Sequence, residues 1–357
     1  MLSQAWYSDL RHVKNWWLVL LWPLALVFFL LSILRRLAYQ FGILKVYRPQ
    51  LPVVVVGNIS VGGNGKTPVV LALASHFISQ GVKCAVLSRG YGGTQKAFPH
   101  LLDTCSSPKQ VGDEPALIFK RLGVDVVIDP VRARGAQFIE ANTQAQVILC
   151  DDGMQHYALA RDVEICVVDG RGLGNGFVMP MGPLRETRSR LNDVDIIISN
   201  RSQKLDDQAK PGRQITGDSD IKSARATRCF DMQLRPASWI NVKSGQSLAV
   251  NEGVERFLHQ EVIALAGIGA PQRFFNTLRE LGLTPKQSLR FDDHHKFVQS
   301  DIPQAPIVLM TEKDAIKCSE FANDNWWYLA VDADISNEFF DSVMQKLHLK
   351  IDNDSED

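Results

Sequence analysis

The chain has 357 residues, in which 39 Lys and Arg residues balance 39 Asp and Glu residues, so the formal net charge is zero. This length predicts about two domains, and the balanced charge gives no reason to expect a nucleic-acid partner. The six cysteines are scattered without C-x-x-C spacing, and we interpret them as reduced core residues of a cytosolic domain. No protein partner is evident.

The N-terminal segment is strongly apolar. Residues 16–34 read WWLVLLWPLALVFFLLSIL, carry no charge, and are numerous enough to cross about 30 Å of hydrocarbon. A secretory signal peptide is the alternative, but the run is too long and has no convincing cleavage site before Arg35. We therefore predict a retained membrane anchor. Because basic residues flank it on both sides, the sequence does not decide whether it spans the bilayer or lies in one leaflet.

A glycine-rich loop follows the next apolar run. Val53–Val56 predicts a central strand of a parallel sheet, and the apolar pattern Val69–Phe77 predicts a helix after the loop. Glycines in such a loop let backbone N–H groups surround an anion, while Lys66 adds a positive charge and Thr67 offers a hydroxyl to Mg²⁺. The predicted phosphate-binding residues are Ser60, Val61, Gly62, Gly63, Asn64, Gly65, Lys66 and Thr67.

This loop departs from the pattern G-x-x-x-x-G-K-[ST] at one position, because Ser60 replaces the first glycine. A plain glycine-rich turn is the alternative, but it leaves the Lys66-Thr67 pair unexplained. Val61 stands where dimerising partition ATPases carry an extra lysine, which argues against that class.

Two polar segments come after the next predicted elements. The strand Lys83–Leu87 ends in SRGYGG, so Arg89 and Tyr91 are expected at a carboxyl strand end, where open α/β sheets bind ligands. An ordinary loop is the alternative. In VGDEP, Asp113 precedes a helix predicted near Pro115; it is either a helix cap or a catalytic group, and the sequence does not separate the two.

The segment AQVILCDDGMQH has the form of a Walker B strand. Val147–Cys150 is apolar and ends in Asp151 and Asp152, as expected for a carboxylate that holds the Mg²⁺ of a nucleotide. Further on, GPLRETRSRL places Arg185 beside Glu186 in a basic cluster. This cluster is either a solvated helix start or a clamp for a phosphorylated substrate.

The second half begins with a polar linker and a small hairpin, followed by a second α/β unit. The turn at Gly267 and Gly269 in that unit is either an anion site or only a tight turn. In FDDHHKF, the adjacent residues His294 and His295 are either a surface turn or contain one proton-handling group, since neighbouring side chains point in different directions.

An N-terminal apolar anchor, SVGGNGKTP, SRGYGG, VGDEP, CDDGMQH, GPLRE, DHH and TEKDA occur together and in this order. The chain resembles the tetraacyldisaccharide 4'-kinase family, the lipid A 4'-kinases of Gram-negative bacteria, over nearly all of its length. The resemblance implies ATP-dependent phosphorylation of the 4'-hydroxyl of a tetraacyldisaccharide 1-phosphate, with ATP and Mg²⁺ as cofactors. It also implies a location at the inner membrane, with the catalytic domains on the cytoplasmic face and a lipid substrate as partner.

The implied fold class is α/β, with two α/β/α sandwich domains of mostly parallel sheets and a P-loop NTPase-like core in the first. A β-hairpin linker would join them, and a membrane-anchoring helix would precede them. The expected boundaries are an anchor over 1–37, a P-loop kinase domain over 38–222, a linker hairpin over 223–256, a C-terminal α/β domain over 257–347 and an acidic tail over 348–357.

The resemblance also implies roles for single residues. Asp113 would be the catalytic base, paired with His294 or His295, and Lys66 would bind the β- and γ-phosphates of the nucleotide. Thr67 and Asp151 or Asp152 would hold the metal ion, with Glu186 as a further acid. The residues implied on the substrate side are Arg89, Tyr91, His156 and Arg185.

Two other functions stay open at this point. A regulatory or transport ATPase of the P-loop class would transfer phosphate to water and drive a partner. A membrane-tethered binding module would keep the P-loop for structure alone.

Overall fold

The computed structural model describes residues 6–7, 13–201 and 228–347. The predicted acidic tail and most of the predicted polar linker lie outside the described residues. Contacts divide the chain into two compact units, neither of which is contiguous in sequence. Unit 1 comprises residues 1–88, 131–233 and 335–357, and unit 2 comprises residues 89–130 and 234–334. The segment 89–130, which the expected boundaries assign to the first domain, therefore groups with the second unit.

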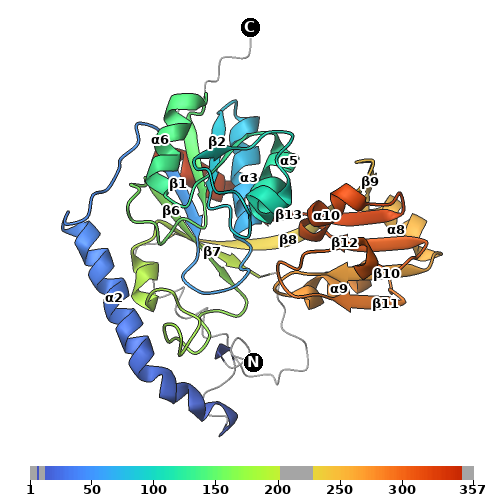
Figure 1. Cartoon of the computed structure of the whole chain (residues 1–357), viewed down its shortest axis with the longest axis horizontal. Helices are drawn as coiled ribbons and strands as arrows, with labels where there is room; N and C mark the ends of the chain where they lie inside the picture. The colour runs from blue at the N-terminus through green and yellow to red at the C-terminus, as the bar shows by residue number, and fades with distance from the viewer. Residues whose placement is uncertain (1–5, 8–12, 202–227, 348–357) are drawn as a thin grey trace. The chain divides into compact units, whose positions relative to one another are not determined.

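Unit 1 is built on a parallel sheet with β1 at its centre (Figure 1). β1 pairs with β5 and β6, β5 also pairs with β2, and β6 continues to β7 and the start of β8. The four valines of β1 are fully buried, as predicted for a central strand. The strands are β1 (Val53–Gly57), β2 (Cys84–Ser88), β5 (Val147–Asp151), β6 (Val163–Asp169), β7 (Ile196–Asn200) and the first part of β8 (Arg228–Asn241).

Helices pack on this sheet through apolar faces. α3 (Lys66–Ser79) contacts β1, β2 and β5 with buried residues that include Val70 and Phe77, which confirms the helix predicted after the loop. α6 (Arg132–Asn142) packs on β2, and α11 (Asn337–Leu347) packs on β6. A short 3₁₀ helix, η2 (Arg188–Asn192), lies in the loop before β7.

The apolar N-terminal segment is helical. A 3₁₀ helix, η1 (Val13–Leu21), leads into α2 (Trp22–Gln40), and Trp17–Gln40 is long and apolar enough to cross a membrane. Large apolar side chains such as Leu31 and Leu34 are exposed along α2. Near its end, Arg36 forms an ion pair of 2.8 Å with Asp193 of unit 1.

Unit 2 contains parallel strands in the order β11-β10-β12-β13, and a β8-β9 antiparallel hairpin. Successive residues of a strand pack in different hydrophobic clusters, on opposite faces of the sheet. Leu309 of β12 and Trp327 of β13 belong to one cluster, while their neighbours Val308 and Trp326 belong to the other. A sheet covered on both faces is the sandwich that the family resemblance implies. The remaining elements are β3 (His100–Leu101), β4 (Asp125–Ile128), β9 (Ser247–Ala249), β10 (Val262–Ala266), β11 (Gln287–Arg290), β12 (Ile307–Thr311), β13 (Trp326–Ile335), α4 (Pro108–Val111), α5 (Asp113–Leu122), α8 (Val250–Leu258), α9 (Pro271–Glu280), α10 (Glu312–Cys318), η3 (Gln299–Asp301) and η4 (Ser319–Phe321).

The cysteines correct one expectation. Cys84, Cys150, Cys166 and Cys318 are buried in the cores, but Cys105 and Cys229 are exposed. The interpretation as core residues is therefore wrong for the last two, which lie in a loop and in an exposed part of β8.

Candidate active site

The glycine-rich loop connects β1 to α3, and α3 begins at Lys66 with its N-terminus toward the loop. Gly65 precedes the helix with φ at 91°, a left-handed conformation that favours glycine. A Cβ there would lie 2.5 Å from Nδ2 of Asn200, which donates a hydrogen bond of 3.1 Å to the carbonyl of Asn64. At Gly63 nothing lies within 4 Å of an added Cβ, so the loop is open on that side. Strand, open glycine loop and helix N-terminus together form an anion-binding arrangement.

Buried side chains stabilise the outer turn of the loop, where a serine replaces the expected glycine. Asn64 Nδ2 donates a hydrogen bond of 2.9 Å to Ser60 Oγ, and both residues are buried. The backbone N–H of Val61 donates to the carbonyl of Pro183 at 2.8 Å. The serine therefore contributes a hydrogen bond within the loop that glycine cannot make.

Two further residues contact this loop, and the sequence analysis missed both. Arg171 donates to Oδ1 of Asn64 at 3.1 Å and pairs at 2.7 Å with Asp169, which ends β6. The Tyr7 hydroxyl donates to the carbonyl of Val61 at 3.3 Å, and the Arg171 guanidinium lies 4.8 Å from the Tyr7 ring centroid. The available signal for Arg171 was its partner Asp169, the acidic residue that ends the strand VEICVVD. No neighbouring residue in the sequence indicated a role for Tyr7.

The two aspartates after β5 have different surroundings. Asp151 ends β5, is buried, and its carbonyl accepts a hydrogen bond of 3.0 Å from Arg132. Asp152 has φ at 50° and lies 3.5 Å from Lys66 Nζ and 3.2 Å from Arg185 Nη1. Burial acts to raise the pKa of Asp152, but the charges of Lys66 and Arg185 outweigh it and lower the pKa below its usual value. A charged carboxylate thus lies beside the loop lysine.

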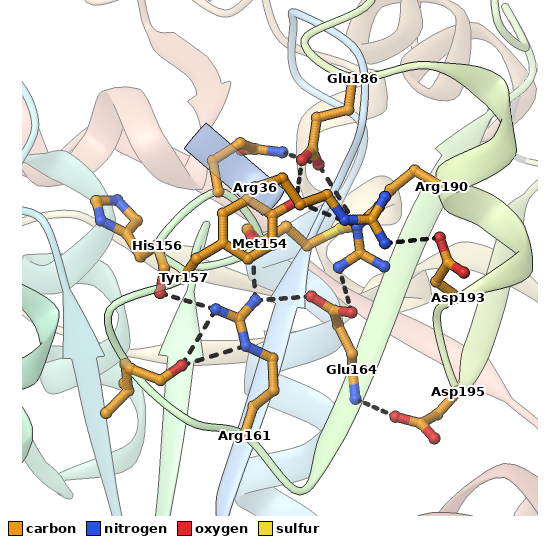
Figure 2. A network of polar contacts seen from close by, with 12 residues as sticks. Arg36, Met154, His156, Tyr157, Arg161, Glu164, Glu186, Arg190, Asp193 and Asp195 are labelled. Carbon is orange, nitrogen blue, oxygen red and sulfur yellow. Dashed lines mark hydrogen bonds and ion pairs between the residues drawn. The ribbon is translucent and has the colours of Figure 1, made fainter. Parts of the chain in front are cut away.

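Glu186 belongs to a polar network, shown in Figure 2, that links the GPLRE loop to the segment after β5. Its carboxylate accepts hydrogen bonds from Gln155 Nε2 at 3.1 Å and from the Tyr157 hydroxyl, and it lies 3.7 Å from Arg190 Nε. Burial, followed by the Glu186 charge, raises the pKa of Tyr157 to about 12, so the phenol remains a donor at neutral pH. These contacts hold Glu186 in one orientation.

The same network also contains a buried cluster of charged side chains. Glu164 on β6 accepts from Arg161 Nη1 at 2.7 Å and from Arg190 Nη2 (Figure 2). Arg161 also donates to the carbonyl of His156 at 2.7 Å, so the backbone of this predicted substrate residue is fixed. In Figure 2 the His156 ring points away from the arginine cluster.

The predicted base and both histidines lie in unit 2, and one of the histidines contacts the base. α5 begins at Asp113, two residues before the predicted start, and Gly112 with φ at 97° occupies the capping position. Asp113 Oδ2 lies 3.2 Å from His294 Nδ1, and the His294 ring packs edge-on against Tyr91 with 5.4 Å between centroids. The alternative of Asp113 as the helix cap therefore does not hold.

His295 has a different partner. Its Nε2 lies 2.9 Å from Asp301 Oδ2, and its ring packs against Phe291 and Phe297, with 4.8 Å between ring centroids in each case. The backbone N–H of Val298 and the histidine lower the pKa of Asp301. The structure thus separates the two neighbouring histidines that the sequence left equivalent.

The turn after β10 is a tight turn closed by the protein's own carboxylate. The Gly267 N–H donates to Asp314 Oδ2 at 2.9 Å, so an anion from outside would compete with a buried aspartate. Of the remaining predicted substrate residues, Arg89 and Tyr91 belong to unit 2 and are exposed, whereas Arg185 belongs to unit 1 beside Asp152.

A parallel α/β sheet with a phosphate-type loop after its central strand, and a strand-end aspartate beside the loop lysine, defines a P-loop nucleotide-binding protein. A family model described as tetraacyldisaccharide-1-P 4'-kinase matches residues 17–348. The chain belongs to this family, and it is a kinase.

Similar proteins cover the chain almost completely. The tetraacyldisaccharide 4'-kinase of Psychromonas ingrahamii is 44% identical over 346 residues, which are 96% of this chain and 98% of the relative. That of Aeromonas hydrophila is 44% identical over 97% of this chain and 96% of its own length. The LpxK structure from Aquifex aeolicus, solved in complex with ATP, matches with a TM-score of 0.74 and 26% identity over 92% of this chain and 99% of that one.

Proposed function

We propose that this kinase transfers the γ-phosphoryl group of ATP to the 4'-hydroxyl of tetraacyldisaccharide 1-phosphate, giving the 1,4'-bisphosphate in lipid A biosynthesis. The names of the relatives support the acceptor, and the ATP bound to the Aquifex aeolicus protein supports the donor. The observation that carries the proposal is the Asp113–His294 pair, because transfer to a sugar hydroxyl requires a group that accepts its proton.

The donor would bind at the glycine-rich loop of unit 1. Phosphoryl transfer depends mainly on positioning and on neutralising charge at the phosphate oxygens. Lys66, at the first turn of α3, supplies the positive charge, and the helix N-terminus and loop N–H groups add to it. The ion pair with Asp152, at 3.5 Å, restricts the position of the Lys66 ammonium.

The side chains near this loop fit a magnesium ion. Mg²⁺ takes oxygen ligands and is usually held by one or two carboxylates together with nucleotide phosphates. Thr67 and Asp151 are buried oxygen donors next to the loop and at the end of β5, with Asp152 adjoining them. In the described part of the chain, no group of three or more His, Cys, Asp or Glu side chains is placed to hold a metal ion. When bound, Mg²⁺ would neutralise charge on the transferring phosphoryl group, with Glu186 as a further acid of the site.

The acceptor chemistry would belong to Asp113. The 4'-hydroxyl oxygen forms a bond to the γ-phosphorus, the bond from that phosphorus to the β–γ bridging oxygen breaks, and ADP leaves. The hydroxyl proton passes to Asp113, and His294 orients this carboxylate through the 3.2 Å contact. Tyr91, Arg89, His156 and Arg185 would contact the sugar or its phosphate.

The reaction would take place at the cytoplasmic face of the inner membrane. Moving a lipid substrate with several acyl groups from the bilayer into water costs about 0.8 kcal/mol for each CH₂ group that was buried, so the enzyme must approach the bilayer. Tyr7, which precedes the apolar segment, contacts Val61, and Arg36, which follows it, contacts Asp193, so the two flanking ends of the segment each contact unit 1. A spanning helix would place these ends on opposite sides of about 30 Å of hydrocarbon, and we therefore assign the segment to one leaflet.

The membrane assignment has a direct test in Leu31→Ser/Leu34→Ser, since these side chains are 62% and 61% exposed. Removing two buried leucines from lipid should cost about 3 kcal/mol, or roughly a hundredfold in vesicle binding. We expect vesicle flotation and lipid turnover to fall, while ATP affinity stays unchanged. Equal losses of ATP affinity would show that these leucines support the fold instead.

The reaction is tested with full-length protein, γ-labelled ATP and tetraacyldisaccharide 1-phosphate in mixed micelles. We expect labelled lipid, and we expect Lys66→Ala and Asp113→Asn to lower kcat by about two orders of magnitude or more while remaining folded. Lys286→Met, which removes an exposed ion pair with Glu261, serves as the matched control. Lipid-independent ATP hydrolysis without labelled lipid would favour the ATPase alternative. ATP binding without either product would favour a binding module.

A further inference from the structure

The motif TEKDA has no role in the chemistry proposed above, yet it lies at a structural junction of unit 2. Thr311 ends β12 and caps α10, its hydroxyl accepting from the Asp314 N–H at 3.3 Å. Helix α10 packs directly against α5, the helix that begins with Asp113. Two charged residues of the motif, Glu312 and Lys313, pair with side chains of this helix, which begins with the base.

Two ion pairs join these helices. Lys313 Nζ lies 2.6 Å from Glu114 Oε1, in the residue that follows the base in sequence. Arg121 Nη1 lies 2.9 Å from Glu312 Oε2, near the other end of α5. Because residues 114 and 121 are two helical turns apart, the pairs fix both the position and the rotation of α5 against α10.

The same helix also stabilises the turn next to the histidine loop. Asp314 is fully buried, accepts from the Gly267 N–H at 2.9 Å, and pairs with Lys317 at 2.9 Å. An added Cβ at Gly267 would lie 3.2 Å from Phe297 and 3.4 Å from the carbonyl of Asp292. This turn therefore packs directly against residues on both sides of His294.

We propose that the TEKDA helix is a brace that sets the distance between Asp113 and His294, with Lys313 and Glu114 as its principal positioning residues. On the α5 side it acts through the Lys313–Glu114 pair, and on the histidine side through Asp314 and the Gly267 turn. This inference rests on the proposed function, in which Asp113 accepts the hydroxyl proton. The contact of 3.2 Å between Asp113 and His294 leaves little tolerance, because a displacement of about 1 Å weakens a hydrogen bond and can cost about a hundredfold in rate.

The experiment compares Lys313→Met, Lys313→Arg and the control Lys286→Met in the full-length protein. We expect Lys313→Met to lower kcat about tenfold, with the affinity for ATP unchanged because the nucleotide loop belongs to unit 1. Lys313→Arg keeps a cation within reach of Glu114 and should restore most of the rate. Thermal unfolding measures stability separately, and Lys286→Met should leave kcat unchanged.

A double-mutant cycle tests whether Lys313 acts through the base. If it does, Lys313→Met should cause little further loss in an Asp113→Asn background, because the group that it positions is already gone. A full tenfold loss in that background would overturn the inference, as would a kcat for Lys313→Met equal to that of the control. If Asp113→Asn itself retains near-wild-type turnover, the proposed base is wrong, and the brace then has no catalytic group to position.

Discussion

Arg190 should be required for the stability of unit 1, because it compensates a buried carboxylate in the charge cluster of Figure 2, and Arg190→Met tests this requirement. The side chains of Arg190 and Glu164 are 4% and 7% exposed, so the substitution leaves a buried carboxylate without one of its two guanidinium partners. Removing one member of a buried pair typically costs about 3–5 kcal/mol. Because Arg161 still lies 2.7 Å from Glu164, we expect the lower end, about 3 kcal/mol of the free energy of unfolding.

The measurement is urea unfolding in detergent micelles, followed by tryptophan fluorescence. Arg201→Met is the matched control, because it removes a pair with Asp231 in which the side chains are 53% and 55% exposed, and exposed pairs contribute at most about 1 kcal/mol. The double variant Arg190→Met/Glu164→Met should recover part of the loss, since no buried charge is then left uncompensated. A loss below about 1 kcal/mol for Arg190→Met would refute the reasoning.

Two further predictions concern groups with a raised pKa. Burial raises the pKa of Glu312 from 4.5 to about 7, so the folded state binds more protons in this range and the free energy of unfolding should fall as pH rises from 4.5 to 7. Glu312→Gln lacks this titration. Measured by urea unfolding, its free energy of unfolding relative to that of wild type should therefore rise by up to about 3 kcal/mol between pH 4.5 and pH 8. A difference between the two proteins that does not change with pH would contradict the assignment. Burial also raises the pKa of Tyr7, which therefore remains a donor to Val61. Tyr7→Phe should weaken binding of a fluorescent ATP analogue by about two- to tenfold, the range for one lost neutral hydrogen bond, and an unchanged affinity would mean that this contact does not support the loop.

The parts of the site that the sequence predicted are those specified by neighbours along the chain. Four valines followed by glycines and Lys66 predict strand, loop and helix N-terminus, because each requirement is met within about fifteen residues. The strand that ends in Asp151 and Asp152 is equally local. Its apolar run predicts burial, and the acidic residues mark its carboxyl end.

The missed contacts join residues that are distant in sequence. Tyr7 lies 54 residues from its partner Val61, and Arg171 lies 107 residues from Asn64. A tyrosine at the start of a chain and an arginine after a strand are common, so only the folded backbone identifies them as supports of the loop. The contact between Asp113 and His294 spans 181 residues and came from the family resemblance, which could not distinguish His294 from His295.

The two adjacent aspartates and the two adjacent histidines, which the sequence left equivalent, differ in the structure in the same way. Among the described residues, only Asp152 and His294 are non-glycine residues with positive φ, at 50° and 62°. Extended neighbours point their side chains to opposite sides, and a left-handed residue breaks that alternation at a cost in backbone strain. The strain is found where Asp152 reaches Lys66 and where His294 reaches Asp113, while Asp151 stays buried and His295 binds Asp301. In each pair, therefore, the left-handed backbone conformation directs one member, Asp152 or His294, toward Lys66 or Asp113, the groups of the proposed chemistry.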